Sequence, residues 1–220
     1  MNSPAFRQSG AIAWMIASAA IVAAGAVWSR PGPGCSAAAL DAGLLAAAAA
    51  WRNGAATQAA TVLTWAGSLA VLGPLAAAIA LWLGRRGERN AAWLIAVAPL
   101  GTGAVNAAVK GLLDCPRPPV AQMLIAAPLD ASYPSSHAAQ ITAFCVAVLF
   151  AMSPGTRRAG ACIAAAAAIA IVCATRIYLG VHYPSDIAAG LAAGWCWTLA
   201  LAGLCGVRWR RATPRGGGHA

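Results

Sequence analysis

Acidic side chains are almost missing from this chain: five of its 220 residues are Asp or Glu, and all charged residues together make up 9%. Lysine occurs once, at Lys110, and aromatic residues make up 7%. Because soluble globular domains carry about 25% charged residues, this composition excludes an ordinary soluble enzyme. It also excludes intrinsic disorder, which requires low hydrophobicity and high net charge. Seven scattered cysteines do not suggest a disulfide-rich scaffold.

Apolar residues take the place of the missing charges. They make up 60% of the chain, and the mean hydropathy is +0.69. A soluble chain of this length could not bury so much apolar surface in one core, so the composition predicts a membrane protein. The formal net charge is +10, but the basic residues lie between apolar runs. We therefore interpret them as loop charges and expect no nucleic-acid partner.

Six apolar runs are close to the roughly 17–25 residues that a membrane-spanning helix needs. A further stretch, 37–51, contains Asp41 and ends at Trp51 and Arg52, which favours an interfacial helix. The expected fold is an all-α membrane protein: six transmembrane helices, an interfacial helix between the first and second, and a catalytic core in the helix bundle. The runs cover residues 10–28, 57–83, 91–113, 138–153, 159–175 and 185–207.

The first run is longer than the apolar part of a signal peptide, so we expect it to be a retained helix. Residues 1–207 then form one domain, and 208–220 form a basic cytoplasmic tail that we expect to be disordered. With both termini in the cytoplasm, ten of the fifteen basic residues fall on the inner side, as the positive-inside rule requires. The Arg- and Ala-rich usage suggests a bacterium, so we expect a multi-pass protein of the inner membrane.

Ionisable side chains gather in the two loops that follow the third and fifth runs, on the extracytoplasmic side. Such residues are costly next to a membrane span and are functional candidates. Cations can neutralise phosphoryl oxygens, while histidines supply a nucleophile and a proton donor. These loops therefore predict phosphoryl chemistry. The group comprises Lys110, Arg117, His137, Arg176, His182 and Asp186, with the hydroxyl of Ser135 beside them.

The spacing of these residues resembles the three-part signature of the type 2 phosphatidic acid phosphatase superfamily. That signature is K-x6-R-P, then P-S-G-H, then S-R-x5-H-x3-D. Here Ser136 replaces the usual glycine and Thr175 replaces the usual serine. Neither change removes a catalytic group, so they bear on substrate fit. The matching positions are Lys110 and Arg117–Pro118, then Pro134–His137, then Thr175–Arg176 with His182 and Asp186.

The resemblance implies a role for each matching residue. His182 is expected to attack phosphorus and form a phosphohistidine, with Asp186 orienting its ring. His137 is expected to protonate the leaving oxygen and then deprotonate water. The phosphoryl oxygens would be held by the helix start at Ser135 and Ser136 and by the cations Lys110, Arg117 and Arg176. No metal and no cofactor is expected.

The expected activity is hydrolysis of a lipid phosphate or diphosphate, with undecaprenyl diphosphate as first candidate and phosphatidic acid or phosphatidylglycerol phosphate close behind. Alternatives are a phosphotransferase with a lipid or sugar acceptor, a lipid A phosphatase and, more remotely, a non-catalytic lipid-binding membrane protein. A vanadium haloperoxidase would use the same pocket, but those relatives are soluble and much larger.

Some residues receive simpler interpretations. Asp114 and Asp130 match no family position, so we expect solvated loop charges. The apolar stretch 123–127 either packs on the bundle or dips into the membrane. Gly190 and Gly194 have the spacing of a close helix contact. Cys35 and Cys115 both fall on the extracytoplasmic side, where a disulfide between them is permitted.

Overall fold

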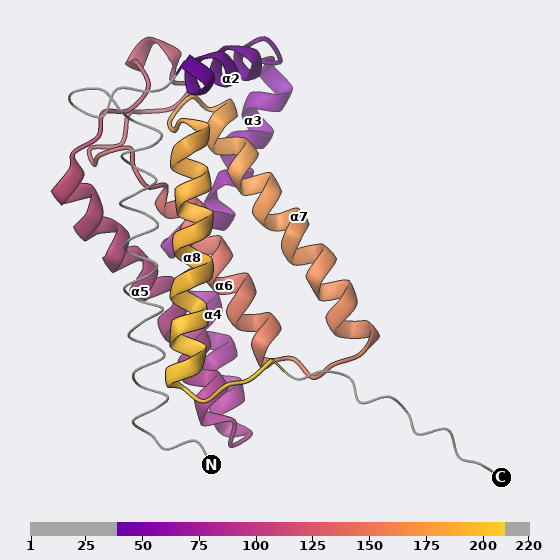
Figure 1. Cartoon of the computed structure of the whole chain (residues 1–220). Helices are drawn as coiled ribbons and strands as arrows, with labels where there is room; N and C mark the ends of the chain where they lie inside the picture. The colour runs from indigo at the N-terminus through magenta and orange to yellow at the C-terminus, as the bar shows by residue number, and fades with distance from the viewer. Residues whose placement is uncertain (1–38, 210–220) are drawn as a thin grey trace.

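The computed structural model describes residues 39–209, and all regular structure within that range is helical. Long helices run side by side as a bundle, and α2 lies across one end of it (Figure 1). The predicted first span at 10–28 lies outside the described range, as do residues 210–220 of the predicted tail 208–220. The helices are α2 (Ala39–Ala49), α3 (Gly54–Leu63), the 3-10 turn η1 (Thr64–Gly67), α4 (Leu69–Arg85), α5 (Arg89–Leu113), η2 (Val120–Gln122), α6 (Ser136–Ala151), α7 (Thr156–Tyr178) and α8 (Pro184–Leu204).

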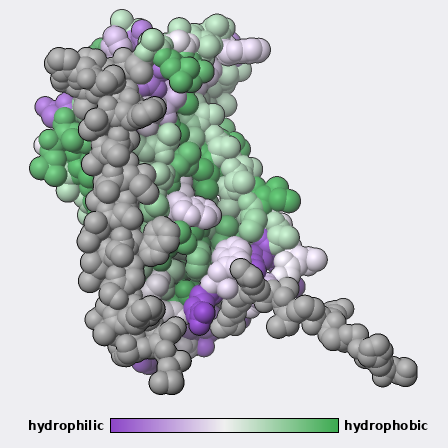
Figure 2. All heavy atoms as spheres, in the orientation of Figure 1, coloured by the Kyte–Doolittle hydropathy of each residue, from purple (hydrophilic) through white to green (hydrophobic). Residues whose placement is uncertain are grey.

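Three of the described helices, α5, α7 and α8, are long and apolar enough to cross a membrane. A fourth span results if the bent pair of residues 54–67 and 69–85 counts as one. Apolar side chains cover the middle of the visible face, and polar side chains gather toward its two ends (Figure 2). The all-helical membrane fold is thus confirmed, while the count of six spans and the interfacial placement of α2 stay predictions.

The predicted run 57–83 is divided between two helical segments, so a single span there stays a prediction. Residues 54–67 and 69–85 meet at an angle of 45°. Ser68, at the break, has extended backbone angles, and its hydroxyl accepts the N–H of Ala70 at 3.1 Å. A serine in this position satisfies an N–H group that would otherwise lack a partner, so it starts a new helix. Hydropathy does not register this because the residues on both sides remain apolar.

Helices α6 and α8 pack closely because α8 presents glycines to α6. A Cβ at Gly190 would lie 2.5 Å from the carbonyl oxygen of Ser135, and a Cβ at Gly194 would lie 2.3 Å from that of Ala139. The predicted close helix contact is therefore confirmed. It brings the first turn of α8 against the first turn of α6, where the N–H of Ser135 donates to the carbonyl oxygen of Asp186 at 3.0 Å.

Helix α2 attaches to the same end of the bundle through a buried carboxylate. Asp41 is 4% exposed. Its two oxygens accept the N–H of Ser185 at 2.9 Å and the hydroxyl of Ser185 at 2.6 Å. A carboxylate at the first turn of a helix also interacts favourably with the positive end of the helix dipole. Asp41 therefore helps to fix the start of α8.

The loop between α5 and α6 packs on the bundle. Met123 and Ile125 contact the buried Leu179 and Val181, and the N–H of Leu124 donates to the carbonyl oxygen of Leu179 at 2.9 Å. The packing interpretation of this stretch is therefore confirmed. The loop covers the segment that leads from α7 to His182.

Candidate active site

Six of the eight predicted residues line one cavity of about 250 Å³ at the end of the bundle near α2. The end of α5, the start of α6, the end of α7 and the segment before α8 each supply a side chain. The signature residues thus share one site, although they are spread over 77 positions of the sequence from 110 to 186. The lining residues are Ser68, Leu69, Lys110, Arg117, Pro128, Asp130, Ser136, His137, Gln140, Arg176 and His182.

His182 is held at both ring nitrogens. Its Nδ1 lies 3.3 Å from Oδ2 of Asp186 and 3.4 Å from the hydroxyl of Ser132. Its Nε2 lies 3.3 Å from the guanidinium of Arg117. A proton on Nδ1, facing the carboxylate, leaves the lone pair on Nε2 directed toward Arg117. This is the tautomer that a nucleophilic histidine needs.

Asp186 is fully buried and serves several partners at once. Besides facing His182, its Oδ2 accepts the hydroxyl of Ser132 at 2.5 Å and the N–H of Tyr183 at 2.9 Å. The Tyr183 bond closes the first turn of α8, so the position of this carboxylate is set by the helix itself. A carboxylate held this way fixes the orientation of the ring beside it.

Burial lowers the pKa of His182 to about 3, and the charges of Arg117 and Arg176 act in the same direction, while Asp186 opposes them. The ring is therefore neutral at physiological pH, and a neutral imidazole is nucleophilic. A positive charge that develops on the ring during attack would be stabilised by Asp186.

The prediction that Asp130 is a solvated loop charge is wrong, because its carboxylate is paired with two cations of the site. Its carboxylate, although 53% exposed, lies 3.0 Å from Nζ of Lys110 and 2.6 Å from the guanidinium of Arg117. Burial alone would raise the pKa of Asp130, but the hydrogen bonds and charges of Lys110 and Arg117 outweigh it and lower the pKa to about 2. The carboxylate of Asp130 therefore pairs with Lys110 and Arg117, the two cations to which the signature assigns phosphate binding.

We expect Asp130→Asn to tighten inhibition by orthovanadate, lowering its inhibition constant by up to about tenfold, which corresponds to about 1.4 kcal/mol. The substitution removes a negative charge that competes with the anion, and the half-exposed position keeps the effect modest. Asp114→Asn is the matched control, because Asp114 is an exposed carboxylate that does not line the cavity. Weaker inhibition of Asp130→Asn would instead show that Asp130 positions the cations.

Arg176 approaches the cavity from the last turn of α7. Its side chain donates to the hydroxyl of Thr64 at 2.9 Å, and both residues are buried. Thr64 belongs to η1, so the break in the apolar run holds one of the predicted phosphate-binding cations. The Nε atom of Arg176 is buried without a hydrogen-bond partner in the described residues, which leaves it available to an anion.

Ser135, at the start of α6, has contacts that the sequence spacing does not indicate. The hydroxyl of Ser135 faces the N–H of Ala138 at 3.5 Å, and its own N–H bonds to Asp186. Ser135 is fully buried, does not line the cavity and caps the helix, so its contact with phosphate stays a prediction. Ser136 and His137 do line the cavity. Their N–H groups, at the positive end of the helix dipole, are the ones placed for an anion.

Three polar residues of the site were missed. Gln140 follows His137 by one helical turn, and that spacing could have identified it. Ser68 marks the break before α4, and the Gly67–Ser68 pair was its only sequence signal. Ser132 carries no sequence signal, because its role depends on where Asp186 lies.

Among the described residues, no group of three or more His, Cys, Asp or Glu could hold a metal ion. Cys35 lies outside them, so its pairing with Cys115 stays a prediction.

Comparisons with known proteins identify the family of this chain. The model of the PAP2 superfamily matches residues 91–210, more than half of the chain. No curated protein matches the sequence significantly. Of the solved structures, a transmembrane PAP2-type phosphatidylglycerolphosphate phosphatase from Bacillus subtilis has a TM-score of 0.68 and 20% identity, over 90% of this chain and 95% of that one. LpxE from Aquifex aeolicus has a TM-score of 0.59 and 23% identity, over 74% of this chain and 96% of that one. The chain belongs to the PAP2 superfamily and is a membrane phosphatase.

Proposed function

We propose that this protein hydrolyses a lipid phosphate or diphosphate through a phosphohistidine intermediate on His182, without a metal. The observation that carries the proposal is the environment of His182. Asp186 lies at Nδ1, Arg117 lies at Nε2, and the ring lines a cavity that also exposes His137 and Lys110. Nucleophile, orienting carboxylate, proton donor and cations are thus within one site.

In the first step, the phosphoryl group enters the cavity and displaces Asp130 from its two cations. Lys110, Arg117 and Arg176 then neutralise the phosphoryl oxygens, with the first N–H groups of α6 as further donors. The lone pair on Nε2 of His182 forms a bond to phosphorus as the bond from phosphorus to the leaving oxygen breaks. Burial and the nearby cations lower the pKa of His137 to about 3, so it takes up a proton as the anionic phosphoryl group binds and then gives that proton to the leaving oxygen.

In the second step, water replaces the departed lipid. His137, now neutral, takes a proton from the water while the water oxygen bonds to phosphorus and the phosphorus–nitrogen bond breaks. Inorganic phosphate leaves, and both histidines return to their initial state. Asp186 stabilises the positive charge on His182 while the phosphohistidine exists.

We further propose that the site faces the extracytoplasmic side of a bacterial inner membrane. Lys110, Arg117 and Arg176 lie at one end of the bundle, and Asp186 holds the start of α8 at the same end. The remaining basic residues of the long helices and their connections lie at the other end: Arg85, Arg86, Arg89, Arg157, Arg158 and Arg208. This asymmetry supports a cytoplasmic location for the second group.

The test is phosphate release by the detergent-purified protein from undecaprenyl diphosphate, phosphatidic acid, phosphatidylglycerol phosphate and lipid A, with His182→Ala as the blank. We expect release that depends on His182, is inhibited by orthovanadate and persists in EDTA, because protein cations hold the phosphate. The kcat/KM ranking identifies the substrate. Loss of activity in EDTA would overturn the metal-independent mechanism, and phosphate transfer to an added lipid or sugar alcohol in place of release would indicate a transferase.

A further inference from the structure

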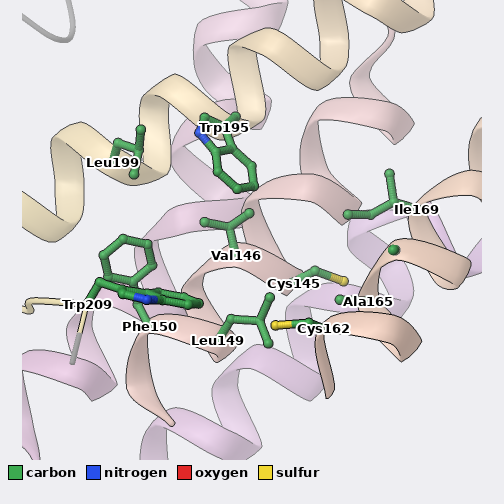
Figure 3. Close-up of a pocket in the computed structure, with 11 residues that line it drawn as sticks. Cys145, Val146, Leu149, Phe150, Cys162, Ala165, Ile169, Trp195, Leu199 and Trp209 are labelled. Carbon is green, nitrogen blue, oxygen red and sulfur yellow. The ribbon is translucent and has the colours of Figure 1, made fainter. Parts of the chain in front are cut away.

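An apolar cavity of about 460 Å³ lies between α6, α7 and α8, in the half of these helices that is farther from the active site. Figure 3 shows Val146 and Leu149 of α6, Ile169 of α7, and Trp195 and Leu199 of α8 around it. Its volume falls in the usual range for ligand pockets, about 300–1,000 Å³. None of its lining residues belongs to the PAP2 signature.

A polar cavity of about 1060 Å³ adjoins this apolar one at the end of the bundle. Phe150 and Trp209 line both cavities, and their rings meet edge to face with centroids 5.3 Å apart. Arg89 and Arg208 line the polar cavity, and the guanidinium of Arg158 lies 4.1 Å from the centroid of the Trp209 ring. The two cavities together are polar and cationic on one side and apolar on the other.

We propose that this pair of cavities binds an anionic glycerophospholipid, with the head group in the polar cavity and one acyl chain in the apolar one. Within a membrane, an apolar cavity offers water no hydrogen-bond partners and loses contacts if it stays empty. A hydrocarbon chain needs no hydrogen-bond partner and supplies the missing contacts, so it is the occupant that suits this cavity. Among the described residues at this end, Glu88 is the one acidic residue and six are arginines, so the charge favours an anionic head group over a zwitterionic one.

The site is separate from the catalytic one but acts on the same helices. Helices α6, α7 and α8 carry His137, Arg176 and Asp186 at their opposite ends. A chain that fills the space between their far halves would hold the three helices at a fixed separation. Binding should therefore raise the melting temperature of the protein.

Native mass spectrometry of the full-length protein tests this proposal. The protein is equilibrated in detergent with equal amounts of phosphatidylglycerol and phosphatidylcholine of matched acyl chains. We expect one phosphatidylglycerol to be retained, at least about fivefold over phosphatidylcholine, and the melting temperature to rise with phosphatidylglycerol alone. Ala166→Phe, which places an apolar ring in the cavity, should abolish retention.

Ala167→Phe is the matched control, because Ala167 is exposed on the same helix and does not line the cavity. It should retain the lipid.

Arg89→Gln combined with Arg208→Gln should leave acyl-chain binding unchanged but remove the preference for phosphatidylglycerol. Equal retention of both lipids by the unaltered protein, or the same loss in both phenylalanine variants, would overturn the proposal. A dimer that Ala166→Phe dissociates would show that a second copy fills the cavity. Phosphatase activity and the melting temperature establish that each variant is folded.

Discussion

Phosphate release is expected to fall by about 10⁵-fold or more when His182 is replaced by alanine, since losing a nucleophile removes the covalent route altogether. The loss should appear in kcat for every substrate. The ring is 2% exposed and lies between Asp186 and Arg117, so no other described histidine can take its place without rebuilding the site. His137 lines the same cavity, but it lies on α6, where no carboxylate of the described residues contacts its ring.

The measurement is rapid-quench turnover of a lipid substrate labelled at the phosphate. The unaltered protein should form an acid-labile phosphoenzyme, which His182→Ala should lack. His137→Ala should still form some phosphoenzyme and accumulate it, because water attack then lacks its base. His219→Ala, which lies outside the described residues, is the matched control and should behave like the unaltered protein. A labelled phosphoenzyme in His182→Ala would refute the assigned nucleophile.

Asp186→Asn is expected to lower kcat by about 10³–10⁴-fold while changing KM little. Loss of an orienting carboxylate has an effect of this size in enzymes with a comparable histidine. The amide keeps the volume of the side chain and one oxygen, so the cavity should stay intact. What changes is the tautomer of His182, because the ring loses the negative charge that holds a proton on Nδ1 and stabilises the imidazolium form.

Because Asp186 also caps α8, the experiment must separate orientation of the ring from stability of the fold. Ser132→Ala is the matched variant, since it removes one hydrogen bond to the same carboxylate and leaves the charge. We expect it to lower kcat about tenfold or less. Steady-state kcat and KM and the melting temperature are measured for both variants. A large rise in KM with kcat unchanged in Asp186→Asn would show that this residue shapes the pocket and does not orient the nucleophile.

The site was predictable from sequence where the chemistry depends on local spacing. His182 and Asp186 are four residues apart at the start of a helix, and this spacing places the carboxylate beside the ring. The grouping of Lys110, Arg117 and Arg176 followed from the signature and from the topology of the apolar runs. These inferences need only helical geometry and the side of the membrane on which each loop lies.

Three features of the structure are not predictable in this way. Asp130 pairs with Lys110 and Arg117 because the loop folds back over them, and nothing in the spacing indicates such a return. At Ser135, the N–H donates to Asp186 of α8 and the hydroxyl accepts the N–H of Ala138 within α6, and the spacing indicates neither bond. The break at Ser68 depends on one hydroxyl within a run that stays apolar on both sides. Each case depends on a long-range contact or a single hydrogen bond, neither of which hydropathy measures.

The close contact of α6 with α8 has a consequence for laboratory evolution of this enzyme. At Gly190 and Gly194, any side chain would meet backbone oxygens that cannot move independently of the helix. Library members that carry any other residue at either position should therefore be inactive, whatever lipid is used for selection. Gly43 and Gly54, near α2 and α3, have open space around the position of a Cβ. Substitutions there should be tolerated, because they leave the separation of α6 and α8 unaltered.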